Sequence, residues 1–298
     1  MNILGVLPYW VVGPWNIGPL TIHSFGLAVA IGLVIGFSLL ARRAERGMGV
    51  SGEFAQNFGI WLLVIGWISA HVLDVLFYEP HMVLEDPLIL FKVWGSISSY
   101  GGLIGGILAT FIWHRRNPDK NLLDWANLGA FSLPFCWLWG RIGCAMVHDH
   151  PGVRAEGFWL WEQIKAIGPE SLPEIWPLAM QFPDGPRHDL GLYEAIWWVF
   201  IVAFCLIMDR KPRRRGFYLW TLPLLYAPAR FALDFLRVEP NQVGTAGDIR
   251  YFGLTPGHYI SVALFALGIV LWLRFRHLPA EVWVRYNPAK PAETNDKK

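Results

Sequence analysis

The run LLDWANLGAFSLPFCWLW, Leu122–Trp139, leads directly into GRIGCAMVHDHPG, Gly140–Gly152. The first part is continuously apolar and about long enough to cross the ~30 Å hydrocarbon core of a membrane as a helix. The second part places an arginine, a cysteine, two histidines and an aspartate where that helix would end. The stretch therefore predicts a membrane-spanning helix with chemically reactive side chains at one end.

The same apolar pattern recurs along the chain. Of its 298 residues, 54% are hydrophobic and only 16% are charged, compared with about 25% charged residues in soluble domains. The apolar windows are Leu20–Ala41, Phe54–Phe77, Ile97–Trp113, Leu122–Trp139, Leu192–Met208, Gly216–Leu233 and His258–Phe275. A β-barrel would instead show segments of about ten residues that alternate in polarity. We therefore predict an all-α polytopic membrane protein with about seven transmembrane helices.

The distribution of basic residues predicts the orientation of these helices. Most of the 25 Lys and Arg residues follow the first, third, fifth and seventh windows, and the densest group lies at residues 210–215. By the positive-inside rule, we expect the N-terminus outside and the C-terminus inside. The dense group fits a topology anchor, with specific binding of a lipid headgroup as the alternative.

The organisation of the chain is predicted to be simple. We find no internal repeat and no low-complexity linker, so we expect one transmembrane domain of seven helices over residues 1–278. Its longest connection is an outward-facing loop segment near residues 141–191, and loops of that length are usually functional. Residues 279–298 are rich in Lys, Pro and Asn, which predicts a disordered and dispensable cytoplasmic tail. The first 19 residues lack Lys and Arg, so we expect no cleavable signal peptide.

Charged side chains at membrane depth cost at least ~2.5 kcal/mol each, so those the sequence retains there are informative. In ARFALDFLR, Arg230, Asp234 and Arg237 are spaced by four and three residues and share one helix face. Asp234 could orient the Arg230 guanidinium and leave its other donors for an anionic ligand. A structural ion pair is the alternative.

A second group opens the third window. In SYGGLIGG, Tyr100 precedes two interleaved GxxxG pairs, which allow another helix or a lipid chain to approach the backbone closely. Helix packing alone also explains the glycines. Tyr100 is either an interfacial tyrosine or part of a site at the outward mouth.

The third group is His148, Asp149 and His150. These residues could form a general base with an orienting carboxylate, two ligands of a metal, or an exposed polar turn before Pro151. No HExxH pattern is present, and we expect no metal. A further pair, His71 and Asp74, fits a hydrogen-bonded helix contact. Together the arginines, imidazoles and carboxylates predict a site for an amphiphile with an anionic head.

GRIGCAMVHDHPG and SYGGLIGG resemble the two signature regions of the prolipoprotein diacylglyceryl transferase family, which are bacterial membrane enzymes that lipidate lipoprotein precursors. Four further segments resemble that family in the same order along the chain. They are IHSFGL, FYEPHMVLEDPLILFKVW, RHDLGLYE and ARFALDFLR. The resemblance covers roughly residues 20 to 275.

The resemblance implies roles for individual residues. Arg141 and Arg230 would face the lipid phosphate. The family has a histidine at the position of Tyr100, and His148 or His150 would supply the imidazole in its place. The implied catalytic residues are Arg141, Arg230, His148, His150, Tyr100 and Asp234. The implied substrate-binding residues are Gly101, Gly102, Gly143, Gly152, Arg237, His23, Tyr193 and Glu194.

The sequence also departs from the family's pattern. Tyr100, His148 and His71 stand where the family has histidine, glycine and arginine, respectively. Cys144 and Val147 stand where it has asparagines, Phe25 where it has tyrosine, and Asp189 and Gly191 interrupt its Pro-Ser-Gln segment.

The activity implied by the resemblance is attack of a prolipoprotein's lipobox cysteine on phosphatidylglycerol, which releases glycerol 1-phosphate. The implied partners are phosphatidylglycerol, prolipoprotein signal peptides and membrane lipids, with no cofactor and no nucleic acid. The implied location is the bacterial plasma (inner) membrane, with the active site toward the outer, periplasmic leaflet. Two alternatives remain: a divergent paralogue with another donor or acceptor, and a lipid-binding or transport protein, although transporters often show paired repeats.

Overall fold

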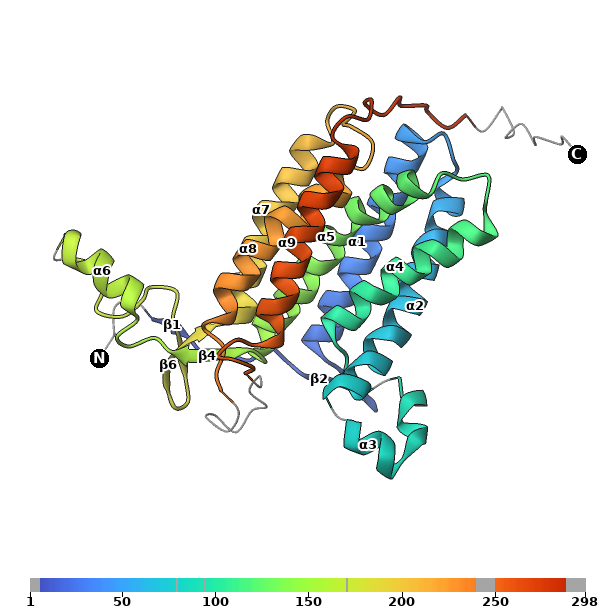
Figure 1. The fold of residues 1–298 in the computed structure, drawn as a ribbon. Helices are drawn as coiled ribbons and strands as arrows, with labels where there is room; N and C mark the ends of the chain where they lie inside the picture. The colour runs from blue at the N-terminus through green and yellow to red at the C-terminus, as the bar shows by residue number, and fades with distance from the viewer. Residues whose placement is uncertain (1–5, 79, 94, 170, 240–249, 288–298) are drawn as a thin grey trace, which may run out of the picture. The chain divides into compact units, whose positions relative to one another are not determined.

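Long helices dominate the structure, a computed structural model that describes residues 6–78, 80–93, 95–169, 171–239 and 250–287 (Figure 1). The long helices are α1 (Ser24–Gly47), α2 (Gly52–Tyr78), α4 (Ser99–Arg116), α5 (Leu122–Val147), α7 (Leu190–Met208), α8 (Phe217–Asp234) and α9 (Pro256–Phe275). Each apolar window of the sequence coincides with one of these long helices. The short helices are α3 (Pro80–Glu85), η1 (Pro87–Phe91) and α6 (Trp159–Ile167). The chain is therefore mostly helical, as predicted, but it is not all-α, because it also contains six short strands in the described residues.

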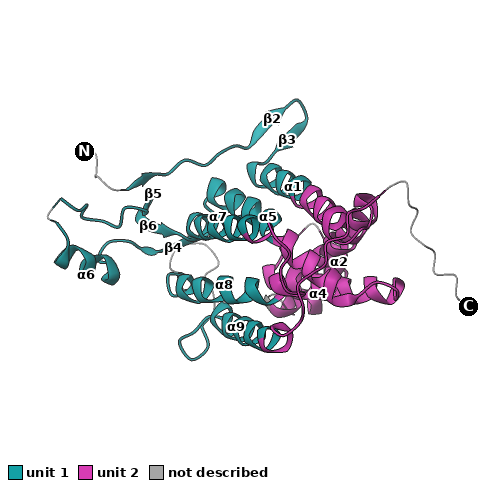
Figure 2. Ribbon diagram, turned by 90° about the horizontal axis from the view of Figure 1, so that it is seen from above, with its two compact units in different colours: residues 1–35, 134–207, 220–272 teal, residues 36–133, 208–219, 273–298 magenta. Residues whose placement is uncertain are grey.

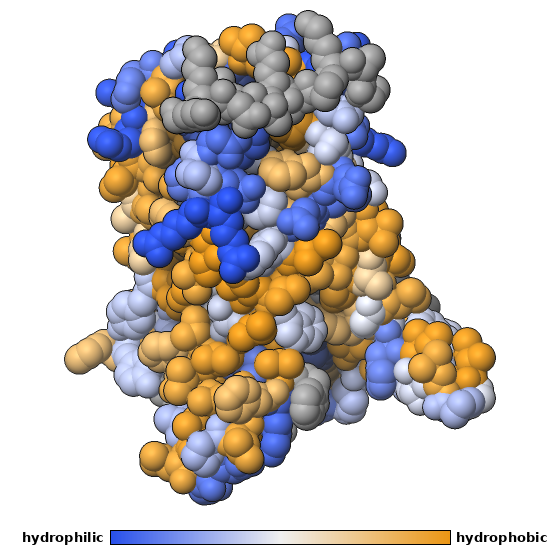
Figure 3. All heavy atoms as spheres, turned by 90° about the vertical axis from the view of Figure 1, so that its right-hand side faces the viewer, coloured by the Kyte–Doolittle hydropathy of each residue, from blue (hydrophilic) through white to orange (hydrophobic). Residues whose placement is uncertain are grey.

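Five helices in the described part of the chain are long and apolar enough to cross a membrane: α1, α2, α5, α7 and α9. The α4 and α8 helices have 18 residues each, and the residues His114, Arg115 and Arg116 in α4 and the charged residues in α8 lower their mean hydropathy. Large apolar side chains of α2 and α4 are exposed, including Ile60, Val64, Ile104 and Phe111. Hydrophobic residues accordingly cover much of the surface in Figure 3. The chain is a multi-pass membrane protein.

The described chain divides into two compact units (Figure 2). Unit 1 comprises residues 1–35, 134–207 and 220–272, and unit 2 comprises residues 36–133, 208–219 and 273–298. We expected a single domain because no linker separates two parts of the sequence. All five boundaries fall inside helices, namely α1, α5, α7, α8 and α9, so no change in composition marks them.

Unit 1 combines helices with a small sheet. Its strands are β1 (Leu7–Pro8), β2 (Trp15–Ile17), β3 (Leu20–Ile22), β4 (Pro151–Arg154), β5 (Met180–Phe182) and β6 (Gly185–Asp189). One sheet has the order β1-β5-β6-β4, with β1 parallel to β5, and β2 pairs with β3 as a hairpin. The expected loop at 141–191 is therefore wrong in part, because α5 continues to Val147 and the segment contains three strands and α6.

Unit 2 packs α2 closely against α4. A Cβ on Gly101 would lie 2.7 Å from the Ser69 carbonyl oxygen, and one on Gly105 would lie 2.8 Å from the Gly66 Cα. The glycines of SYGGLIGG thus serve close contact between helices, as one interpretation of the sequence held. The apolar core of this unit is made by Leu40, Ala44, Ala55, Phe58, Trp113, Trp125 and Leu128.

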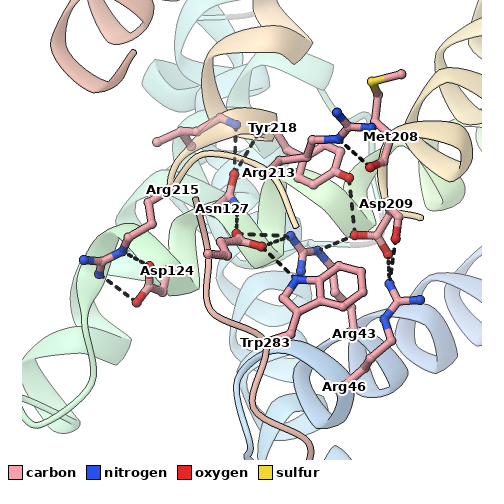
Figure 4. Close-up of polar contacts among 12 residues, drawn as sticks. Arg43, Arg46, Asp124, Asn127, Met208, Asp209, Arg213, Arg215, Tyr218 and Trp283 are labelled. Atoms are coloured by element: carbon pink, nitrogen blue, oxygen red, sulfur yellow. Dashed lines mark hydrogen bonds and ion pairs between the residues drawn. The ribbon is translucent and has the colours of Figure 1, made fainter. Parts of the chain in front are cut away.

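Unit 2 also contains a polar cluster around Arg43 of α1, which is 4% exposed (Figure 4). The Arg43 guanidinium lies 2.8 Å from a Glu281 oxygen and 3.3 Å from an Asp209 oxygen. Asn127 donates to Glu281 at 2.8 Å, and Ala280 bridges to Arg214. The described residues 279–287 therefore depart from the expected disordered tail, because Glu281 neutralises a buried arginine. Residues 288–298 of that tail lie outside the described part of the chain.

Candidate active site

The site begins at the last turns of α5. The helix continues past Gly140, and Arg141 is only 7% exposed. Its Nε lies 3.0 Å from Oε2 of Glu194, a residue of α7 that is 1% exposed. A buried arginine requires such a partner, because an unpaired charge away from water is costly.

The same carboxylate also binds a second arginine. Nη1 of Arg230 on α8 lies 2.8 Å from Oε1 of Glu194, and Nη2 of Arg230 lies 2.9 Å from Asp234. Arg237 lies 3.4 Å from Asp234, so the predicted grouping of these three residues on one face is confirmed as geometry. Glu194 came only from the resemblance, and its bridging of two arginines was not predicted.

Further donors complete the carboxylates of this network. The Tyr226 hydroxyl donates to Glu194 at 3.1 Å, and the Thr255 hydroxyl donates to Asp234. His258 of α9 lies 3.9 Å from the same Asp234 oxygen. We call Arg141, Glu194, Arg230, Asp234 and Arg237 the arginine network. Its guanidinium groups offer oriented N–H donors, which suit an anion such as a lipid phosphate.

Local sequence explains why α7 begins beside α5. Asp189 ends β6, and its Oδ1 accepts a hydrogen bond from the Leu192 backbone N–H at 3.1 Å, as a helix N-cap does. At Gly191, a Cβ would lie 3.1 Å from atoms of Cys144 and Ala145. A larger residue would separate the two helices and lengthen the distance between Arg141 and Glu194.

His148 occupies a buried position that the sequence did not predict. Its φ is +52°, a left-handed conformation that costs energy for any residue except glycine. Its Nδ1 lies 2.6 Å from the fully buried Asp189, and its Nε2 lies 3.2 Å from the Trp10 carbonyl oxygen. Because both ring nitrogens are occupied, His148 is a poor candidate for the general base. Asp189, the missed partner, had one signal in the sequence, its position just before an apolar helix.

His150 remains the other histidine proposed as a base. Burial, followed by the charges of Arg141 and Arg237, lowers its pKa, while Asp149 raises it. The net shift leaves a neutral imidazole at neutral pH, and a neutral imidazole can accept a proton. Its Nδ1 lies 3.6 Å from an Asp149 oxygen.

Cys144, Asp149 and His150 offer ligand atoms within 4.8 Å of one another. Such a set could in principle hold a metal ion such as zinc. The Arg141 charge acts on both Cys144 and His150, however, and it disfavours a cation there. The absence of a metal from the function stays a prediction.

Two signature glycines permit close backbone contacts. A Cβ on Gly143 would lie 3.0 Å from the Phe25 ring, so this glycine brings α5 against α1. A Cβ on Gly152 would lie 2.8 Å from the Leu236 carbonyl oxygen and 2.9 Å from the His188 Cβ. The backbone of Gly152 also forms an isolated antiparallel β-bridge with that of Arg237, which connects the arginine network to β4. Both glycines thus shape the site, although direct binding of substrate stays a prediction.

Tyr193 and His23 lie at the margins of unit 1. The Tyr193 hydroxyl lies 2.9 Å from Nδ1 of His188 and donates to the Leu178 carbonyl oxygen at 3.1 Å. His23 is exposed before α1, and its carbonyl oxygen accepts a hydrogen bond from the Leu27 N–H. Neither side chain contacts the arginine network among the described residues.

Tyr100, Gly101 and Gly102 belong to unit 2. Ser98 caps α4 by accepting a hydrogen bond from the Gly101 N–H at 3.4 Å. The Tyr100 hydroxyl oxygen is buried and has no hydrogen-bond partner among the described residues. A buried hydroxyl without a partner costs about 1–3 kcal/mol. Tyr100 therefore has an unused donor.

Residues 14–274 match the family model described as prolipoprotein diacylglyceryl transferase. This chain belongs to that family. A phosphatidylglycerol--prolipoprotein diacylglyceryl transferase from Glaesserella parasuis is 30% identical over 88% of this chain and 92% of its own length. Proteins of the same name from Pseudomonas putida and Vibrio parahaemolyticus are both 31% identical. The first covers 96% of this chain and 100% of the relative, and the second covers 86% and 87%.

Two contacts hold the start of α7 against the end of α5 in this member of the prolipoprotein diacylglyceryl transferase family. His148 and Asp189 are hydrogen-bonded to each other. Cys144 packs against Gly191, where a Cβ would lie 3.1 Å from the Cys144 Cβ.

Proposed function

We propose that this protein transfers the diacylglyceryl group of phosphatidylglycerol to the lipobox cysteine of prolipoproteins. The arginine network carries the proposal. Guanidinium groups bind phosphate oxygens in pairs, and two of them are held in fixed orientations by Glu194 and Asp234. The names of the family's relatives supply the donor and the acceptor.

The reaction requires a thiolate and a stabilised leaving group. The acceptor thiol gives its proton to a base, for which we propose His150, since only the thiolate attacks efficiently. Its sulfur bonds to the glyceryl carbon that carries the phosphate. The carbon–oxygen bond breaks with its electrons on oxygen, and glycerol 1-phosphate leaves with the proton.

The arginines act on the charge that develops in this step. Arg141 and Arg230 would donate to the phosphate oxygens, with Glu194 and Asp234 fixing the planes of the two guanidinium groups. Donors that are already oriented need no rearrangement during the reaction, which is the main advantage of such a site. Arg237 adds positive charge to the site, in which it is held by its ion pair with Asp234.

Tyr100 would supply a further hydrogen bond to the phosphate. With an ordinary pKa near 10, a tyrosine is a poor base at neutral pH but a good donor. Gly101, Gly102, Gly143, Gly152, His23 and Tyr193 stay as proposed substrate contacts. A Tyr100→Phe variant with unchanged rate and affinity would remove Tyr100 from the site.

The proposed setting is the bacterial inner membrane. We propose seven transmembrane helices, with the N-terminus outside, the C-terminus inside and the site toward the outer leaflet. The excess of basic residues after alternate helices supports this orientation. No cofactor, metal or nucleic acid is required.

The test uses purified protein, phosphatidylglycerol and a lipobox peptide, with mass spectrometry of the peptide. We expect a diacylglyceryl-modified peptide from the wild type and an Arg154→Ala control, whose arginine is 53% exposed. Arg141→Ala should abolish the product. Product that persists in folded Arg141→Ala would refute the role of the network. No product from the wild type, or product only with another donor lipid, would refute the assigned reaction.

A further inference from the structure

His71 of α2 is 1% exposed and contacts two backbone carbonyl groups in unit 2. Its Nδ1 lies 3.0 Å from the Ser96 oxygen, and its Nε2 lies 2.9 Å from the Ile89 oxygen. The sequence predicted that the pair His71 and Asp74 serves a hydrogen-bonded helix contact, and His71 makes such contacts. The imidazole therefore reaches across to the segment before α4.

The chemistry of these contacts fixes the protonation of the ring. A carbonyl oxygen can only accept a hydrogen bond, so each ring nitrogen must donate one. A neutral imidazole has one N–H and would turn a lone pair toward the second carbonyl at hydrogen-bond distance. Only the imidazolium satisfies both contacts.

The contacted segment determines where α4 begins. The Trp67 indole donates to the Val93 carbonyl oxygen at 2.7 Å, and the Ser98 N–H donates to the Ala70 oxygen at 3.0 Å. Ser98 then caps α4, two residues before Tyr100. His71 thus makes two of the bonds that fasten the start of α4 to α2.

Close packing makes this attachment specific. A Cβ on Gly95 would lie 3.2 Å from Cε1 of His71, so the chain passes directly over the ring. A Cβ on Gly101 would lie 2.8 Å from the Ala70 Cα, one residue before His71. A shift of Gly95 and Ser96 would therefore displace the first turn of α4.

The charged groups nearby leave the two carbonyls as the partners of His71. Asp86 and Lys92, at the two ends of η1, pair with each other at 2.9 Å. The Ile89 carbonyl oxygen also accepts a hydrogen bond from the Lys92 N–H at 2.9 Å, and its second lone pair is available to His71. Asp74 lies on α2 itself.

We infer that His71 is a positioning residue, an imidazolium that places Tyr100 by binding the carbonyl groups of Ile89 and Ser96. This inference rests on the proposed function, in which Tyr100 donates to the lipid phosphate. The effect on the reaction passes through Tyr100, since His71 is buried behind the segment that it binds.

The protonation of His71 can be tested without activity. Protein labelled with ¹⁵N-histidine would be compared with His71→Gln, which identifies the His71 signals, and with His277→Gln, an exposed control. We expect both ring nitrogens of His71 at the chemical shift of protonated N–H groups. One nitrogen at the unprotonated shift would overturn the inference, whatever the enzyme catalyses.

The positioning role requires a double-mutant cycle. We expect His71→Gln to lower kcat about tenfold, the loss that one charge-assisted hydrogen bond supports, and His71→Arg to recover most of it, because arginine can donate to both carbonyls. In a Tyr100→Phe background, His71→Gln should cause little further loss. Fully additive losses, or an arginine variant no better than glutamine, would refute the role. A wild type without transferase activity would refute the proposed function and leave the spectroscopic test to decide on the imidazolium.

Discussion

Replacing Glu194 by glutamine tests the arginine network directly. The substitution keeps the volume of the side chain and removes the charge that lies 3.0 Å from Arg141 and 2.8 Å from Arg230. Arg230 retains Asp234 at 2.9 Å. Arg141 retains the Trp137 ring, with its guanidinium carbon 6.0 Å from the centroid.

The expected cost follows from these contacts. Breaking a buried ion pair by removing one partner costs about 3–5 kcal/mol. Only Arg141 loses its carboxylate completely, and a cation–π contact offsets about 0.5–1 kcal/mol. We therefore expect Glu194→Gln to lower the free energy of unfolding by about 3 kcal/mol. Glu162→Gln, which breaks a surface pair with Lys165, should lower it by less than about 1 kcal/mol.

The measurement is equilibrium unfolding in mixed micelles, with and without phosphatidylglycerol. Because the variant has one more net positive charge, the anionic lipid should restore more stability to Glu194→Gln than it adds to the wild type. A double variant with Arg141→Gln should be less destabilised than the two single losses combined. A Glu194→Gln protein as stable as the Glu162→Gln control would refute the reasoning.

Three further perturbations have defined outcomes. Burial lowers the pKa of His188 to about 4, below its unfolded value of about 6.5. Its contribution to the stability of the folded state is therefore complete above pH 6.5 and is lost as the pH falls toward 4. The free energy of unfolding should drop by up to about 3 kcal/mol over that range, and an equal drop in His188→Leu would contradict this. Phe252 is fully exposed with a φ of +50°, so Phe252→Gly should stabilise the protein by about 1 kcal/mol in thermal unfolding, whereas Phe235→Gly, inside an ordinary turn, should not. Truncation after Leu278 should cost about 2 kcal/mol because Arg43 loses Glu281, and truncation after Asn287 should be neutral; equal stability of the two would show that the Glu281 contact contributes nothing.

The helices were predictable because their signal is local. Each apolar window begins within four residues of a helix start, and the ends of α1 and α5 were placed too early, at Ala41 and Trp139 instead of Gly47 and Val147. The window stopped at Trp139 because Gly140 and Arg141 end the apolar run. The helix continues because Glu194, distant in the sequence, neutralises Arg141, and no window over neighbouring residues contains that information.

The site was predictable only where its residues are close in sequence. The spacing of Arg230, Asp234 and Arg237 indicated their shared face, and the resemblance supplied Arg141 and Glu194. The pairing of His148 with Asp189 joins residues 41 positions apart and converts an expected base into a buried contact. The strands between residues 151 and 189 escaped detection because each is short and the sheet is completed by Leu7–Pro8.

The Arg43 cluster links the two ends of the polypeptide in the order of its synthesis. Arg43 leaves the ribosome early, and Glu281 follows 238 residues later. During translation the arginine therefore lacks one of its two carboxylates until Glu281 has been added. A chain that stops before Glu281 carries a buried charge that is incompletely neutralised, so this cluster completes its folding only after α1 to α9 have been made.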